Sequence, residues 1–296
     1  MGTIGSLNLV NNNSRINVQN NGQIGNVNSQ SSGQGSTQIE NNGGIANVSA
    51  QNNGATFNLQ NNGGINNVGV QNNGGTFNFA NTGGINDLNL ENLGGGTANA
   101  VNYGGMHNMN VTNSGGATVN LANYGGMHNM NIANNGAKTT ANVANYGGMN
   151  SVSATNNAAN FNFANFGGMQ SASVTNTNLG NASIANYGGM NSINTQTYRA
   201  HTEIANFAGL GSLYAKDQND DTYIYNQGNI GQATLVANGA RGYINFQNAG
   251  GVGSMFADAN YGGVIDINNL FGSIDALTAD ANGASHNQRS QINILS

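Results

Sequence analysis

The chain of 296 residues carries a net charge of −5, has only 6 Lys and Arg residues and 46 Gly, and lacks Pro, Cys and Trp. So few basic residues argue against nucleic acid as a partner, the absence of Cys excludes disulfides and thiolate metal sites, and no window approaches the 18 apolar residues of a membrane span. Asn-rich chains with few charges are either disordered or prone to β-stacking, because little repulsion opposes self-association.

The chain begins with an incomplete repeat unit, residues 1–19, in which Ile16 and Val18 are already in register with Asn20. The first five residues lack the charged and apolar regions of a signal peptide, so we expect none within this sequence. Regular repeat units follow over residues 20–206. Residues 207–296 are expected to form degenerate units and the C-terminal end of the same domain, so the sequence predicts a single domain over residues 1–296.

One Asn recurs through the chain at intervals of 20 to 22 residues, and Gly stands two places later in eleven of thirteen cases. A fixed period of this length is typical of a repeat architecture. We call this series the first ladder: Asn20, Asn41, Asn61, Asn81, Asn102, Asn123, Asn145, Asn165, Asn186, Asn206, Asn226, Asn248 and Asn269. A second ladder lies between its members: Asn52, Asn72, Asn92, Asn113, Asn134, Asn156 and Asn176.

Apolar residues alternate before and after each first-ladder Asn, as in Phe77/Phe79 and Leu88/Leu90. Alternation at period two predicts strands, and no segment keeps a helical period. Each unit is therefore expected to be strand, Asn-Gly corner, strand, Asn-Gly corner, with corner residues that tolerate positive φ. An antiparallel meander would also fit these corners.

A β-solenoid explains more than a meander, because each residue then lies about 4.8 Å above its equivalent in the previous coil. Identical side chains stack into ladders in that arrangement, as Asn does in cross-β structures. The sequence therefore predicts an all-β, cross-β solenoid with two strands per coil of about 20–21 residues and about 13–14 coils.

The coil from Phe77 to Asn92 reads Phe-Asn-Phe-Ala-Asn-Thr-Gly-Gly-Ile-Asn-Asp-Leu-Asn-Leu-Glu-Asn, and it fills every slot of the repeat. This pattern resembles the curlin repeat of bacterial curli major subunits, with Asn in place of most of the family's anchor Gln residues. The resemblance implies that Asn61, Asn66 and Asn72, with their equivalents, face inward and bond along the stack. It also implies an extracellular amyloid fibre that scaffolds biofilm, built by subunits adding head to tail, with a nucleator and a secretion machinery as possible partners.

An aromatic stripe follows the first ladder directly, beside a row of Met residues that includes Met106 and Met127. Its members are Tyr103, Tyr124, Tyr146, Phe166, Tyr187 and Phe207. Strand parity predicts both rows off the inner face, at or around the corner. Two interpretations stay open: stacking that staples successive coils, or an exposed edge used for adhesion or bundling.

The remaining polar groups offer little chemistry. His107 and His128 occupy equivalent slots and are expected to stack, but a metal site needs more ligands. Asp217, Asp220 and Asp221 could ligate Ca²⁺, although a solvated, enlarged corner fits the charged run 214–221 better. Residues 92–202 contain no Asp or Glu, and no nucleophile constellation or phosphate-binding loop stands out, so we expect no catalysis, no cofactor and no metal.

Two functions fit these observations. The first is the structural subunit of an extracellular, curli-like fibre that polymerises head to tail. The alternative is a soluble solenoid binding module, such as a phage or adhesin shaft or an ice-binding protein. Ice binding would favour a flat Thr ladder, and outward Thr residues do not recur at one slot through the whole chain.

Overall fold

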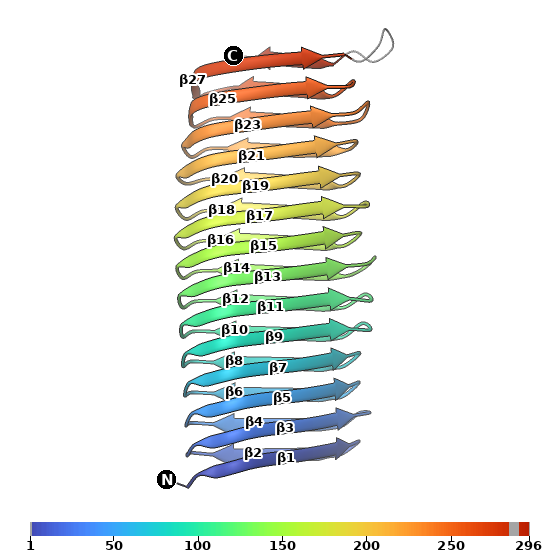
Figure 1. Ribbon diagram of the computed structural model, residues 1–296, viewed down its shortest axis with the longest axis vertical. Helices are drawn as coiled ribbons and strands as arrows, with labels where there is room; N and C mark the ends of the chain where they lie inside the picture. Colours follow the sequence, from blue (N-terminus) through green and yellow to red (C-terminus); the bar gives the residue numbers. More distant parts are fainter. Residues whose placement is uncertain (1, 284–289, 296) are drawn as a thin grey trace. The chain divides into compact units, whose positions relative to one another are not determined.

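The computed structural model describes residues 2–283 and 290–295, which contain 28 β-strands and no helix. By its contacts the chain divides into two units, residues 1–149 and 150–296. Within each unit the odd-numbered strands form one parallel sheet and the even-numbered strands form another, with each strand paired to the next but one in sequence (Figure 1). This pairing excludes the antiparallel meander and confirms the predicted β-solenoid.

Unit 1 contains seven coils. Its odd sheet consists of β1 (Ile4–Asn12), β3 (Ile24–Ser32), β5 (Ile45–Asn53), β7 (Ile65–Asn73), β9 (Ile85–Leu93), β11 (Met106–Ser114) and β13 (Met127–Asn135). Its even sheet consists of β2 (Arg15–Asn20), β4 (Ser36–Asn41), β6 (Thr56–Asn61), β8 (Thr76–Asn81), β10 (Thr97–Asn102), β12 (Thr118–Asn123) and β14 (Thr140–Asn145).

Unit 2 repeats the plan, with β15 beginning one residue before it. The odd sheet consists of β15 (Met149–Asn157), β17 (Met169–Thr177), β19 (Met190–Tyr198), β21 (Leu210–Gln218), β23 (Ile230–Asn238), β25 (Gly251–Asn260) and β27 (Ser273–Asn282). The even sheet consists of β16 (Asn160–Asn165), β18 (Asn181–Asn186), β20 (His201–Asn206), β22 (Asp221–Asn226), β24 (Tyr243–Asn248), β26 (Val264–Asn269) and β28 (Gln291–Leu295).

The core of each coil is the inner face of its two strands. Phe57, Phe77 and Leu88 are at most 1% exposed, and each lies in register with an apolar residue of the neighbouring coil. Phe57 stacks on Phe77 with 5.8 Å between ring centroids. Each buried apolar side chain packs on the equivalent side chain of the neighbouring coil. This packing explains why the apolar positions recur so strictly in the sequence.

The alternation of inner and outer side chains breaks once in every odd strand. In β7, Ile65 and Val68 are buried while the two residues between them are exposed, and Asn66 takes no part in the pairing with β5. The expectation that Asn66 faces inward is therefore wrong. Two consecutive outward residues shift the parity of the strand, which the period-two rule does not anticipate.

The same shift moves the Met row into the core. Met106, Met127 and Met169 are only 3–5% exposed and occupy the slot of Ile65, so their expected position off the inner face is wrong. The aromatic residue that precedes each Met by three positions remains outside.

Glycine has different roles at the two corners. At the second corner Gly54 has φ of 78°, the left-handed conformation expected there. At the first corner Gly125 does not adopt a positive φ; instead, a Cβ on it would lie 1.9 Å from the carbonyl oxygen of Gly104 in the previous coil. The first corner therefore requires Gly for the close approach of stacked backbones.

Candidate functional site

The first ladder is a row of buried amides that hydrogen-bond along the stack. Asn123 Nδ2 donates to Asn145 Oδ1 at 3.0 Å and to the carbonyl oxygen of Gly125 at 2.6 Å, while its own Oδ1 accepts from Asn102 Nδ2 at 3.2 Å. The same side chain therefore joins three coils and closes its own corner. The Asn-x-Gly spacing follows from this geometry, because the amide of Asn123 donates to the carbonyl of Gly125, two positions later in the chain.

The same pattern holds at both ends of the series. Asn20 bonds to Asn41 at 2.7 Å in unit 1, and Asn248 bonds to Asn269 at 2.8 Å in unit 2. Asn20 and Asn269 are half-buried, whereas the other members of the first ladder are at most 2% exposed. The predicted Asn ladder, with its stacked hydrogen bonds, is confirmed.

The second ladder is equally buried in unit 1. Asn113 accepts from Asn92 at 3.0 Å and donates to Asn134 Oδ1 at 2.9 Å, to the Ala117 carbonyl at 3.2 Å and to the Thr140 carbonyl at 2.8 Å. All seven predicted members are at most 1% exposed. These amides bridge the odd and even sheets at the second corner.

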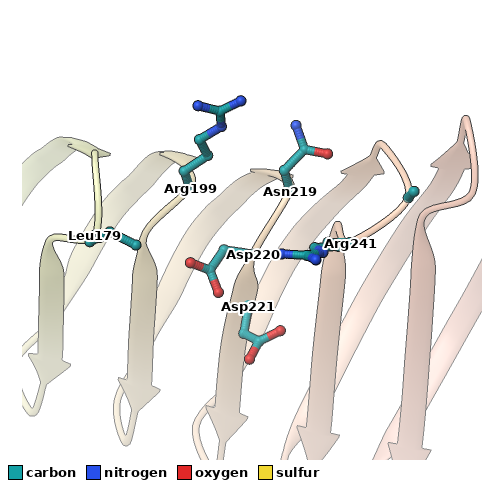
Figure 2. A pocket seen from close by; sticks show the side chains of 7 residues that line it. Leu179, Arg199, Asn219, Asp220, Asp221 and Arg241 are labelled. Atoms are coloured by element: carbon teal, nitrogen blue, oxygen red, sulfur yellow. The ribbon is translucent and has the colours of Figure 1, made fainter.

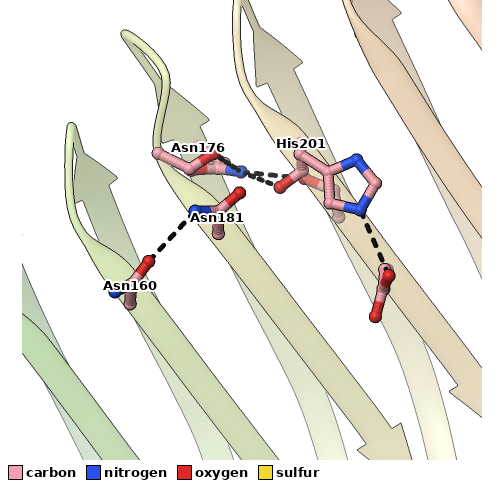
Figure 3. A network of polar contacts seen from close by, with 7 residues as sticks. Asn160, Asn176, Asn181 and His201 are labelled. Carbon is pink, nitrogen blue, oxygen red and sulfur yellow. Dashed lines mark hydrogen bonds and ion pairs between the residues drawn. The ribbon is translucent and has the colours of Figure 1, made fainter.

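In unit 2 the second ladder changes its chemistry. Asn176 donates to the His201 carbonyl at 2.6 Å and to Thr202 Oγ1 at 3.1 Å, as Figure 3 shows for the His201 contact. The next three residues in the slot are Thr197, Asp217 and Ala237. The intervals from Asn176 are 21, 20 and 20 residues, so counting the period onwards would have placed Asp217 in this ladder.

Asp217 is therefore a core residue, and the expectation that it forms part of a solvated corner is wrong. Its side chain is fully buried; Oδ2 accepts from Thr222 Oγ1 at 2.9 Å and Oδ1 accepts from the backbone N–H of Asp220 at 3.2 Å. Burial raises the pKa of the Asp217 carboxyl to about 7, with the hydrogen bonds from Thr222 and Asp220 opposing the shift. The protein thus holds a carboxyl that titrates near neutral pH inside its second ladder.

The aromatic stripe lies on the surface in both units. Tyr103, Tyr124 and Tyr146 are 45–55% exposed, and their rings stack at 4.9 and 4.7 Å between centroids with interplanar angles of 12° and 4°. Phe166, Tyr187 and Phe207 stack in the same way in unit 2. The rings cover one another's faces, so the stripe presents ring edges to the solvent and supports the stapling of successive coils.

Charged side chains gather along the second corners of four successive coils of unit 2. An open cleft of about 660 Å³ is lined by Leu179, Arg199, Asn219, Asp220, Asp221, Ala240 and Arg241 (Figure 2). Figure 2 shows the side chains of Arg199 and Asn219 projecting outward from their corners. Among the described residues, none of the four charged side chains in this cleft forms an ion pair. The cleft mixes both signs of charge and selects no single class of ligand.

The structure offers no assembled metal site in the residues that it describes. His107 and His128 stack as predicted, with 4.8 Å between ring centroids, and His107 Nδ1 lies 3.2 Å from Asn86 Oδ1. Across residues 2–283 and 290–295, no helix is long and apolar enough to cross a membrane.

The sequence reasoning missed two further features of unit 1. Thr residues lie five positions before successive first-ladder Asn residues and stack in register on the outside of the even sheet: Thr56, Thr76, Thr97, Thr118 and Thr140. A parallel row of outward Asn residues lies two positions after each of these Thr residues in the sequence. Both rows could have been found by counting from the first ladder.

Comparisons with known proteins add no relative. No protein-family model matches this chain, and neither a search of curated proteins nor a search of solved structures found a match. The repeat and the β-solenoid fold fit a structural repeat protein.

Proposed function

We propose that the chain is the structural subunit of an extracellular, curli-like amyloid fibre that polymerises head to tail and scaffolds a biofilm matrix. The observation that carries the proposal is the exposure of inner apolar side chains in the last described coil, which β27 and β28 form. Val252 and Ile265 are buried in the coil before it, but their partners Ile274 and Ile292 are only half-buried, and Ile294 is 52% exposed. In the part of the chain that the structure describes, these inner apolar side chains stay partly exposed, whereas their partners in the coil before are buried.

The strands of the end coils support the same proposal. Within the described residues, β27 and β28 each pair with one strand only, as do β1 and β2 at the other end. Unpaired backbone N–H and C=O groups on such edges template the addition of another strand. Pro, which would block pairing, is absent from the chain.

The repeat register supplies the fit between the two ends. Continuing it places Ile4 on Ile274 and Leu7 on Leu277, and Ile16 on Ile292 and Val18 on Ile294. These four contacts are all apolar on apolar, as are most inner contacts within both units. The repeat pattern and the sparse charge further favour a self-assembling fibre, since little repulsion opposes stacking.

Seeded growth tests the proposal. Val18→Lys places a charge on the half-buried inner face of β2, whereas Asn17→Lys places it on the exposed outer face of the same strand. Preformed fibres of the unchanged protein should seed growth of the Asn17→Lys variant without a lag and should fail to do so with Val18→Lys. Circular dichroism checks that both variants keep their β-structure.

Two outcomes would contradict the proposal. One is a full-length chain that stays monomeric for days at high concentration, which would favour the binding-module alternative. The other is equal seeding of the two variants, which would show that the end coils do not meet in the repeat register. Immunolabelling of intact cells tests the extracellular location separately, because a fibre found only inside cells would leave assembly intact and remove the matrix role.

A further inference from the structure

The outside of the even sheet of unit 1 is a flat surface built from three rows of side chains on β6, β8, β10, β12 and β14. We call it the Thr–Asn face. Its rows are Thr56, Thr76, Thr97, Thr118 and Thr140; Asn58, Asn78, Asn99, Asn120 and Asn142; and Gln60, Ala80, Val101, Ala122 and Ala144. These five strands carry no charged residue. Identical side chains recur from strand to strand in the Thr and Asn rows, and the third row is short except for the exposed Gln60 at its edge, so most of the face has a short repeat.

Hydrogen bonding within the face is already directed along the stack. Asn99 Nδ2 donates to Asn78 Oδ1 at 2.8 Å, and Asn99 Oδ1 accepts from Asn120 Nδ2 at 2.8 Å. The bonds from Asn78 to Asn58 and from Asn142 to Asn120 continue the row at 2.7 and 2.8 Å. Covering these amides with another surface therefore leaves much of their bonding intact, which lowers the cost of removing water from them.

The opposite face of unit 1 is unlike it. The outward positions of β9 include Asp87 and Glu91, and an open groove of about 530 Å³ crosses this sheet where Gly69 stands between Ser49 and Asn89. Charge and a hollow both oppose close packing of that sheet against a flat surface. Within unit 1, the five strands from β6 to β14 in the even sheet offer an uncharged, regular face, whereas β2 and β4 of the same sheet carry Arg15 and Glu40.

We propose that the Thr–Asn face is an interface between two copies of this chain, which pack face to face through it. An uncharged face meets its own copy without repulsion, and small side chains in regular rows can interdigitate as they do between paired sheets in cross-β assemblies. Five strands about 4.8 Å apart and six residues long cover ~480 Å² per copy, so a pair buries ~1,000 Å², which is the lower end of specific interfaces. Two isolated copies therefore associate weakly.

This interface goes beyond head-to-tail growth, because it uses the side of the solenoid and not its ends. In a fibre the Thr–Asn face would recur in every subunit, and paired filaments would gain from the many contacts made at once. Lateral pairing and end-to-end growth can therefore succeed or fail independently.

Cysteine cross-linking tests the interface, since the chain has no Cys and each substitution creates a single thiol. Asn99 lies in the middle row of the middle strand and is half-buried; Asn110 lies in an outer Asn row of the odd sheet and is more exposed. Under mild oxidation, Asn99→Cys should form intermolecular disulfides at least tenfold faster than Asn110→Cys. A rate for Asn99→Cys that is equal or lower would overturn the proposal, because random collision favours the more exposed thiol.

Charge substitution provides the second measurement. Asn99→Asp and Asn99→Lys should each abolish concentration-dependent dimerisation in analytical ultracentrifugation, and an equimolar mixture of the two should restore it. Dimerisation unaffected by either charge would overturn the interface. Loss of dimer in both variants without recovery in the mixture would also overturn it, and would assign the face to a different occupant, such as an ordered water lattice or ice.

The end-blocked Val18→Lys background separates this proposal from the fibre proposal. Asn99→Cys should still cross-link in protein that cannot elongate. If it cross-links there and no fibre ever forms from the unchanged chain, the interface stands and head-to-tail growth fails. If fibres form as single filaments in which Asn99→Cys does not cross-link, head-to-tail growth stands and the interface fails.

Discussion

The second corner of the coil differs between the two units, although the backbone pairing around it is the same. In unit 1 most of these corners place Gly at the left-handed position and Asn in the second ladder, as at Gly54 and Asn52; Asn13, Lys138 and Ser31 are exceptions. In unit 2 the left-handed position is more often held by other residues, such as Ala158, Leu179 and Arg199, with Gly again at Gly239 and Gly262. After Asn176 the ladder continues as Thr, Asp and Ala. The parallel register persists through these changes.

This difference shows which interactions define the coil. Backbone pairing and stacked apolar residues are common to both units, whereas the amide ladder of the second corner is replaced in unit 2 without loss of register. The corner can therefore vary in sequence and carry charge, as the cleft beside Arg199 and Asp220 shows. The predictions below test how much each version of the corner contributes to stability.

The largest expected effect is the removal of a second-ladder amide from unit 1. Asn113→Ala leaves Asn92 Nδ2 and Asn134 Oδ1 without their bonds to this side chain, and it also removes a donor from the carbonyls of Ala117 and Thr140. Asn92 Nδ2 keeps its bonds to the Gly96 and Thr118 carbonyls, and the Ala117 carbonyl keeps the Thr140 N–H. At about 1–3 kcal/mol for each group that is left unsatisfied, we expect unit 1 to lose on the order of 4 kcal/mol. Hydrogen exchange across the coils, with denaturant unfolding followed by circular dichroism, measures the loss.

Asn110→Ala on the same strand is the control. The side chain of Asn110 points outward, so its amide is exposed and water can replace its hydrogen bonds. We expect a loss of less than about 1 kcal/mol for it. Similar losses at positions 110 and 113 would show that the inner amides contribute no more than the outer ones, and the contrast between the two units would then lose its energetic meaning.

The next effect is a pH dependence confined to unit 2. The folded-state pKa of Asp217 is about 7, above its ordinary value of 3.8, so the folded form binds the proton more tightly. The resulting stabilisation is present in full below pH 3.8, declines as the pH rises, and is lost once the pH passes about 7. At about 1.4 kcal/mol per unit, the difference between pH 4 and pH 8 has an upper bound of about 4 kcal/mol.

Asp217→Asn should remove this dependence and make unit 2 more stable than the unchanged protein at pH 8, because a neutral amide can still accept from Thr222. Asp221→Asn on the same corner is the matched control and should leave most of the dependence in place, because burial is the largest cause of the raised pKa of Asp217 and the charge of Asp221 the smallest. Thermal unfolding of the three proteins between pH 4 and pH 8 provides the comparison. An unchanged slope in Asp217→Asn would mean that another group causes the pH dependence.

The smallest effect concerns the left-handed position itself. Gly54 has φ of 78° and Ala158 has φ of 52°, so exchanging the two residue types should have opposite effects on the two units. A left-handed conformation costs a residue with a Cβ about 1–2 kcal/mol, and the greater freedom of Gly in the unfolded chain offsets part of this.

We therefore expect Gly54→Ala to destabilise unit 1 by about 1 kcal/mol and Ala158→Gly to stabilise unit 2 by a similar or smaller amount. A Cβ on Gly54 would come no closer than 3.5 Å to the Gly33 carbonyl oxygen, so the change tests backbone strain without a clash. Denaturant midpoints measure both. Changes of the same sign in the two units would show that side-chain contacts at the corner outweigh its backbone conformation.

Much of the fold was predictable from the sequence because it depends on local period. The spacing of the first ladder predicts stacked coils, and alternation at pairs such as Phe77/Phe79 predicts strands and their inner face. The buried first and second Asn ladders follow from the same counting. These features need no knowledge of distant contacts, since each coil packs on a near copy of itself.

Tertiary structure alone decided the side-chain directions where the period-two rule fails. Two consecutive outward residues, 66 and 67 in β7 and 107 and 108 in β11, put Ile65 and Met106 in the core. The hydrogen-bonded register, and not strict alternation, sets which side chains meet the next coil. For Asp217, counting the period from Asn176 indicates the slot, but only the structure shows that the slot keeps its burial after Asn has been replaced, with Thr197 and Ala237 directly beside Asp217 across the sheet. The sequence determined the repeat, and stacking determined what each repeat position became.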